Sequence, residues 1–114
     1  MALSVHNIVI DCESPPRLAR FWSAAMGYGI THADERSARL TPGPGGQDPH
    51  LILVKVPERK IAKNRLHLDL AASDPEAEIR RLRELGATAV ATRRMDELTW
   101  TVMRDPEGNE FCVG

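Results

Sequence analysis

The chain contains one pattern of elements twice, and this internal repeat restricts its fold more than any other feature. In residues 6–27, an apolar stretch leads into a turn and then into a helical pattern that runs from a proline to a glycine. Residues 67–86 repeat the same order with the same proline-to-glycine distance. Each copy opens with a histidine, His6 in the first and His67 in the second. The repeat predicts a strand followed by a helix at the start of each half.

The apolar residues of each helical pattern lie on one face. They are Leu18, Phe21, Trp22, Ala25 and Met26 in the first copy and a narrower stripe of Ile79, Leu82 and Leu85 in the second. A helix with one apolar face covers a sheet. Ser73 and Glu76 have the spacing of a capping box, which predicts that Ser73 caps the second helix.

Three short segments of strand character follow each glycine. They cover residues 28–33, 36–41 and 50–56 in the first half and residues 87–92, 98–104 and 109–113 in the second. The alternation is clearest after residue 97, where Leu98, Trp100 and Val102 share one face. Each half therefore reads as a strand, a helix and three strands.

This order predicts an α+β fold of two tandem βαβββ modules. The modules cover about residues 3–57 and 64–114, with a linker at 58–63. A chain of 114 residues with 42% apolar and 27% charged side chains has the composition of one globular domain. We therefore predict that both modules belong to a single domain of residues 1–114.

The formal net charge is only −1. This leaves no excess positive charge for a nucleic acid backbone or an anionic membrane surface, so we expect neither partner. The first residues lack the charged-then-apolar run of a signal peptide, which indicates a cytoplasmic protein. In that reducing compartment, Cys12 and Cys112 are expected as free thiols.

Basic residues gather around the linker, at Arg59, Lys60, Lys63 and Arg65. A charge cluster of this kind is typical of a solvated connection. The alternative is a basic rim that attracts an anionic ligand. The sequence leaves both interpretations open.

Several motifs are more specific. Residues 105–111 read Asp-Pro-Glu-Gly-Asn-Glu-Phe, the first helix carries Arg-Leu-Ala-Arg-Phe-Trp from Arg17, and the second copy opens with His-Leu-Asp-Leu at His67. Together with the duplicated βαβββ unit, these motifs resemble the vicinal oxygen chelate superfamily, in particular its glyoxalase-like domain branch. That superfamily includes glyoxalase I, bleomycin-resistance proteins, extradiol dioxygenases and fosfomycin-resistance thiol transferases. The resemblance covers nearly the whole chain and implies curved mixed sheets that form a cup, with the helices outside and a floor that can hold one divalent metal.

The resemblance also implies where metal ligands would lie. The family places them on the first and last strands of each half, and the first-strand positions fall on His6 and His67, whose imidazoles suit a transition metal. Counted from the aspartate of the turn, the last-strand carboxylate of the second half is replaced by Cys112. Its counterpart in the first half falls among residues 51–56, which offer only aliphatic side chains and Lys55.

Glu110 precedes Cys112 by two residues and therefore shares its face of the last strand. A substitute site of His6, His67 and Glu110 can thus be drawn for Zn, Ni, Mn or Fe, with open positions for water or substrate. Each residue also has a structural interpretation, the histidines as hydrogen-bonded residues of the cup and Glu110 as an exposed residue at a strand edge. Cys112 is either a nucleophile or an inert thiol, and Trp100 either stacks on a planar ligand or belongs to the core.

Two classes of function follow from this set of residues. In the first, the cup is metal-free, as in proteins resembling bleomycin-resistance factors, and binds a small organic ligand through His6, His67, Trp100, Glu110 and Cys112. In the second, a metal polarises a carbonyl or enediolate oxygen in a lyase, isomerase, dioxygenase or thiol-transfer reaction, with Glu110 as the candidate catalytic residue. The incomplete ligand set favours the binding function, whereas the retained pair of histidines favours the enzyme, and the sequence leaves both open. The sequence has no catalytic-triad order or nucleotide fingerprint, so hydrolases and dehydrogenases built on those motifs are excluded.

The quaternary structure gives a first testable prediction. An open edge of such a cup exposes apolar strand surface, and single-domain members of the superfamily commonly pair, so we expect a homodimer. Sedimentation at micromolar protein concentration should show a species of twice 12.6 kDa. A single species of 12.6 kDa at that concentration would contradict the dimer.

Overall fold

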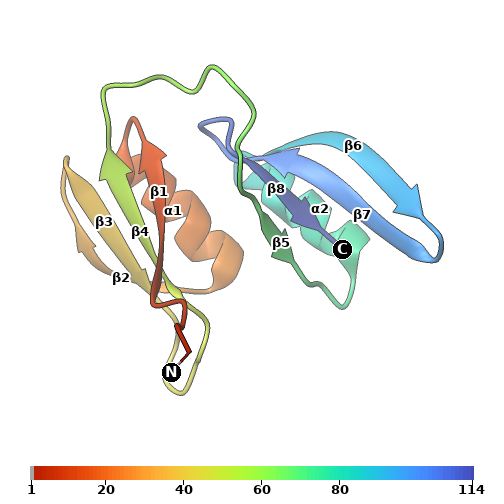
Figure 1. The fold of residues 1–114 in the computed structure, drawn as a ribbon, viewed down its shortest axis with the longest axis horizontal. Helices are drawn as coiled ribbons and strands as arrows, with labels where there is room; N and C mark the ends of the chain where they lie inside the picture. Colours follow the sequence, from red (N-terminus) through yellow and green to blue (C-terminus); the bar gives the residue numbers. More distant parts are fainter. Residues whose placement is uncertain (1) are drawn as a thin grey trace. The chain divides into compact units, whose positions relative to one another are not determined.

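The computed structural model describes residues 2–114, which form two compact units. The first unit ends at Arg59, and the second runs from Lys60 to Gly114 (Figure 1). Each unit has the order strand, helix and three strands, which confirms the predicted α+β fold with two βαβββ modules. Neither described helix has the length and hydropathy that crossing a bilayer requires.

The first unit is built around a sheet with the strand order β1-β4-β3-β2. Its elements are β1 (Asn7–Cys12), α1 (Pro15–Met26), β2 (Gly29–Ala33), β3 (Ser37–Thr41) and β4 (His50–Lys55). β1 and β4 are parallel, whereas β4, β3 and β2 pair in antiparallel fashion. The helix buries the apolar face that its spacing predicts, and Leu18, Phe21 and Trp22 are almost fully buried.

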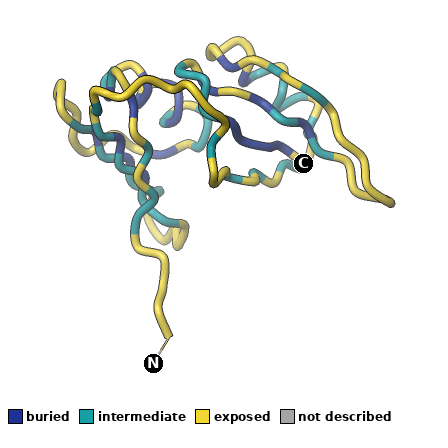
Figure 2. The backbone as a smooth tube through the Cα atoms, turned by 45° about the horizontal axis from the view of Figure 1, so that its top comes forward, coloured by how far each residue is buried: buried dark blue, intermediate teal, exposed yellow. Residues whose placement is uncertain are grey.

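The second unit repeats this arrangement with the strand order β5-β8-β7-β6. Its elements are β5 (Leu68–Leu70), α2 (Pro75–Glu84), β6 (Thr88–Met95), β7 (Leu98–Arg104) and β8 (Glu110–Val113). β5 lies parallel to β8, while β8, β7 and β6 pair in antiparallel fashion. β8 is buried along its whole length, whereas the hairpin of β6 and β7 ends in exposed residues (Figure 2).

Proline sets the start of both helices. Each helix has a proline in its first positions, where the missing N–H group would have no partner within the helix. Because Pro75 opens α2, the cap is Asp74, whose side chain accepts a hydrogen bond from the N–H group of Ala77 at 3.2 Å. The predicted capping box is therefore wrong, since Ser73 lies one residue too early to cap this helix.

A β-bulge changes the face that part of the second sheet presents. The pairing of β6 with β7 shifts between Ala89 and Ala91, which makes Val90 the extra residue. A shift of one residue moves every following side chain to the other face of the strand. As a result, Arg93 pairs directly with Trp100 and shares its face of the sheet.

The turn before β8 is organised by the carboxylate of Asp105, which is only 3% exposed. Its Oδ1 accepts hydrogen bonds from the backbone N–H groups of Glu107 at 2.9 Å and Asn109 at 3.0 Å, and its Oδ2 accepts one from the side-chain amide of Asn109 at 2.9 Å. Gly108 has a φ of +88°, a conformation that favours glycine. This turn sets the start of β8 at Glu110.

Replacement of Asp105 tests this role. Asp105→Ala leaves two backbone N–H groups of the turn without an acceptor, so we expect the free energy of unfolding to fall by about 2 kcal/mol. Asp105→Asn keeps one oxygen acceptor, so its free energy of unfolding should fall by less than that of Asp105→Ala. Urea denaturation followed by circular dichroism measures both variants. Asp34→Ala is the control, because it removes similar backbone hydrogen bonds from an exposed turn. Its free energy of unfolding should fall by less than that of Asp105→Ala. An equal fall in the two variants would show that burial of the Asp105 carboxylate adds nothing to stability.

Candidate functional site

A pocket of about 730 Å³ opens on one face of the second sheet. Trp100, Val102 and Cys112 line it, whereas the alternating residues Met103 and Phe111 are buried on the opposite face. The remaining lining residues are Lys60, Ile61, Ala62, Lys63 and His67 before or at the start of β5, Val90 and Arg93 of β6, and Arg104, Glu107, Gly108 and Glu110 around the turn. All of them belong to the second unit.

The strand register orders the floor of this pocket. The residue pairs that cross this face are Arg93–Trp100, Val102–Cys112 and Arg104–Glu110. Paired residues on one face lie side by side, and successive pairs form rows across the sheet. The pocket therefore has an aromatic end, a largely apolar middle and a charged end.

The carboxylate of Glu110 occupies the charged end. It is only 9% exposed, so Glu110 is not the exposed strand-edge residue of the structural interpretation. Its Oε1 accepts a hydrogen bond from the N–H group of Asn64 at 2.8 Å and lies 3.1 Å from Nζ of Lys60, while Nε of Arg104 lies 3.7 Å from Oε2. Burial acts to raise the pKa of Glu110, but the hydrogen bonds from Asn64 and Lys60 outweigh it and lower that pKa below its ordinary value. The carboxylate is therefore ionised.

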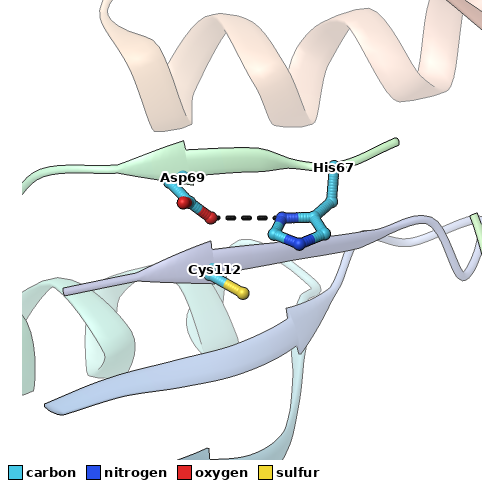
Figure 3. A group of neighbouring side chains, drawn as sticks. All are labelled: His67, Asp69 and Cys112. Atoms are coloured by element: carbon cyan, nitrogen blue, oxygen red, sulfur yellow. Dashed lines mark ion pairs between the residues drawn. The ribbon is translucent and has the colours of Figure 1, made fainter. Parts of the chain in front are cut away.

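His67, Asp69 and Cys112 form a cluster at the β5 side of the sheet (Figure 3). Cys112 pairs with Asp69, and His67 precedes Asp69 by two residues, so strand geometry places the three side chains on one face. Nδ1 of His67 lies 3.1 Å from Oδ1 of Asp69. Their candidate ligand atoms, together with Sγ of Cys112, all lie within 4.8 Å of one another.

The thiol of Cys112 is kept neutral by its surroundings. Burial raises the pKa of Cys112, and the negative charge of Asp69 raises it further, whereas Lys63 lowers it by a smaller amount. The thiol is thus protonated at neutral pH. Because the thiolate is the nucleophilic form, this environment favours the inert thiol over the nucleophile.

His6 lies in the first unit, directly before β1, and is exposed. Its ring is nearly parallel to that of His50, with ring centroids 6.4 Å apart and an interplanar angle of 19°. Nδ1 of His50 in turn lies 3.4 Å from Oγ1 of Thr41. The ligand set of His6, His67 and Glu110 draws on both units and stays a prediction.

Two sets of donors can be compared with what a divalent metal requires. Glu110 fits poorly, because its oxygens already accept hydrogen bonds from Asn64 and Lys60. The cluster of His67, Asp69 and Cys112 fits better, since imidazole, carboxylate and thiolate are all ligands of Zn²⁺ and their donor atoms converge. Binding there would release the thiol proton of Cys112.

The pocket brings together the predicted site residues of the second unit, which are His67, Trp100, Glu110 and Cys112. Sequence reasoning misses Asp69 as their neighbour, although the His-Leu-Asp spacing of β5 is a usable signal because it places both polar side chains on one face. It also misses Arg93. No sequence signal reveals that residue, because the bulge at Val90 reverses the alternation of β6.

Solved structures share this fold. FosX, a fosfomycin resistance protein from Mesorhizobium loti, is 15% identical, with a TM-score of 0.77 over 99% of this chain and 92% of that chain. A mutant FosX from Listeria monocytogenes, complexed with Mn(II) and 1S,2S-dihydroxypropylphosphonic acid, is 9% identical, with a TM-score of 0.80 over 99% and 90% of the two chains. The bleomycin-binding protein of Streptomyces verticillus, complexed with copper(II)-bleomycin, is 16% identical, with a TM-score of 0.68 over 99% and 96%. At these identities the likeness shows the fold alone.

Sequence comparison identifies the family. No curated protein matches the chain significantly. The family model described as the glyoxalase-like domain matches residues 7–114, and together with the solved structures it confirms the resemblance to the glyoxalase, bleomycin resistance and dioxygenase superfamily. Because the match covers nearly the whole sequence, this chain belongs to the glyoxalase-like domain family.

Proposed function

We propose that the pocket of the second unit binds a small organic ligand without the full metal-ligand set of the superfamily. The observation that carries this proposal is the pocket itself, because a volume of about 730 Å³ is in the range of small-molecule sites. Its aromatic end and apolar middle offer a ligand contact area, and the polar groups of its charged end can fix the orientation of that ligand. Two relatives of the same fold support a small-molecule role, since one is described as bleomycin-binding and another holds a dihydroxypropylphosphonic acid.

Trp100 is the residue on which a planar group would stack. Its side chain is half-buried and lines the pocket, on the face opposite the fully buried Met103. This position supports the ligand-stacking interpretation over membership of the core. An indole ring offers a planar ligand a large contact surface at a fixed orientation.

A second candidate is a metal-dependent lyase, isomerase, dioxygenase or thiol transferase. The converging donor atoms of His67, Asp69 and Cys112 favour it, and the Listeria monocytogenes relative contains Mn(II). A bound metal would polarise a carbonyl or enediolate oxygen of the substrate. In this candidate Glu110 is the catalytic residue, since its ionised carboxylate can accept a proton while Lys60 and Asn64 hold it in place.

We also propose a cytoplasmic homodimer. The edge strand β2 is exposed along its length, and an open edge of this kind is a surface on which a second copy can pair. Neither Cys12 nor Cys112 is part of a disulfide, which is the state that a reducing compartment would maintain.

A neutral planar probe tests the ligand pocket. We expect 2-naphthamide to shift the indole N–H signal of Trp100 in NMR spectra of isotope-labelled protein. Trp100→Leu should weaken binding about tenfold, because stacking on an aromatic side chain contributes on the order of 1–3 kcal/mol. Leu98→Ala is the matched control, because Leu98 lies on the same strand and face as Trp100 but outside the pocket. This variant should change the affinity for 2-naphthamide by less than about twofold. Equal losses in both variants, or no binding to the wild-type protein, would contradict the proposal.

The metal content separates the two candidate functions. We expect the isolated protein to contain well under one equivalent of Ni, Zn, Mn or Fe per chain, because Lys63 and Arg93 line the same pocket and repel a divalent cation. Elemental analysis of protein purified without chelator or added metal gives this value. A stoichiometric metal that His67→Ala removes would support the enzyme instead. His32→Ala is the matched control, because His32 is also exposed and paired with an aspartate at 3.0 Å.

A further inference from the structure

The lining of the pocket carries more positive than negative charge. Its cations are Lys60, Lys63, Arg93 and Arg104, and its carboxylates are Glu107 and Glu110. Lys60 and Arg104 both lie beside Glu110. Among residues 2–114, Lys63 and Arg93 form no ion pair with a carboxylate. Two cationic groups therefore remain available to a ligand.

Arg93 lies close enough to Trp100 to contact a ligand that stacks on its indole ring. The two residues form a direct cross-strand pair on the pocket face, and such pairs have Cβ atoms about 5 Å apart. The guanidinium group presents parallel N–H donors that match the two oxygens of a carboxylate. A carboxylate attached to a ring on Trp100 is therefore within reach of Arg93.

Lys63 belongs to the basic cluster around the linker, which the sequence allows to be either a solvated connection or a rim for an anionic ligand. The N–H group of Asn64 donates to the carboxylate of Glu110, and the ammonium of Lys60 contacts both that carboxylate and the carbonyl of Ala62. These contacts hold residues 60–64 against the sheet, where Lys60, Ile61, Ala62 and Lys63 form a wall of the pocket. The structure thus supports the basic rim over the purely solvated linker.

We propose that the ligand of this pocket is a small planar organic anion, an aromatic or conjugated carboxylate whose ring lies on Trp100 and whose carboxylate is bound by Arg93 and Lys63. This inference rests on the proposed function and adds the charge and shape of the ligand. The net charge of the whole chain is −1, so the preference comes from the local arrangement of cations rather than from long-range attraction.

Three probes with one ring system test the charge preference. Isothermal titration calorimetry compares 2-naphthoate, the neutral 2-naphthamide and the cationic 2-naphthylmethylammonium. We expect the naphthoate to bind about tenfold more tightly than the amide, and the ammonium to bind more weakly than the amide. An amide that binds as tightly as the naphthoate would overturn this inference and leave the proposed function standing. No binding of any probe would overturn both.

Two neighbouring arginines provide a matched pair of variants. Arg93→Gln should weaken naphthoate binding about tenfold and leave amide binding unchanged, because only the carboxylate needs the guanidinium. Arg94→Gln removes the same charge from the next residue, which pairs with Thr99 and does not line the pocket. Its naphthoate affinity should stay within about twofold of the wild type. Equal losses in the two variants would overturn the assignment of Arg93. Both side chains are exposed, and circular dichroism checks that both variants fold.

Discussion

The buried carboxylate of Glu110 ties the start of the second unit to its last strand. It accepts a hydrogen bond from the backbone of Asn64 and lies next to Lys60 and Arg104. An ionised group with this little exposure is stable only when donors surround it, so the segment before β5 has to lie over the sheet. This interaction holds one wall of the pocket in place and keeps Lys63 at its rim. Because the segment brings its lysines to the sheet, the site is basic although the net charge of the chain is −1.

The same interaction also bears on the metal-ligand role that the sequence predicts for Glu110. A glutamate held by Asn64 and Lys60 is a poor metal ligand but a good anchor. The groups that converge as donors are instead His67, Asp69 and Cys112, on the β5 side of the sheet. Glu110 and the donor cluster therefore lie on neighbouring rows of one face, which leaves the aromatic end of the pocket to a ligand.

Local patterns in the sequence predict most of the fold, because helix and strand periodicities depend on burial of one face. The apolar stripe through Leu18 and Trp22 is buried as expected. The alternation around Trp100 does predict a strand, but the face that this strand buries carries Thr101 and Met103, and the face of Leu98 and Trp100 is the more exposed one. The start of α2 is mispredicted because Pro75 fixes the cap at Asp74, and the proline constraint is stronger than the capping-box pattern. The error is one of backbone geometry rather than of hydrophobic pattern.

The candidate site is harder to predict because its members meet through pairing between distant strands. Asp69 meets Cys112 only through the parallel register of β5 and β8. Arg93 reaches the pocket face only because of the bulge at Val90, which no alternation pattern reveals. The burial of Glu110 depends on the backbone N–H group of Asn64. Every residue except proline carries such a group, so the sequence does not reveal this partner.

If one face of the second sheet is a ligand site, a bound ligand has to perturb the residues of that face. Backbone amide signals followed by NMR during a titration with 2-naphthoate would map the perturbed residues. We expect the shifted signals to belong to residues 60–64 and to the strands β6, β7 and β8, with Arg93 and Trp100 among the most affected. Shifts confined to residues before Arg59, or to α2, would contradict a ligand site on this face.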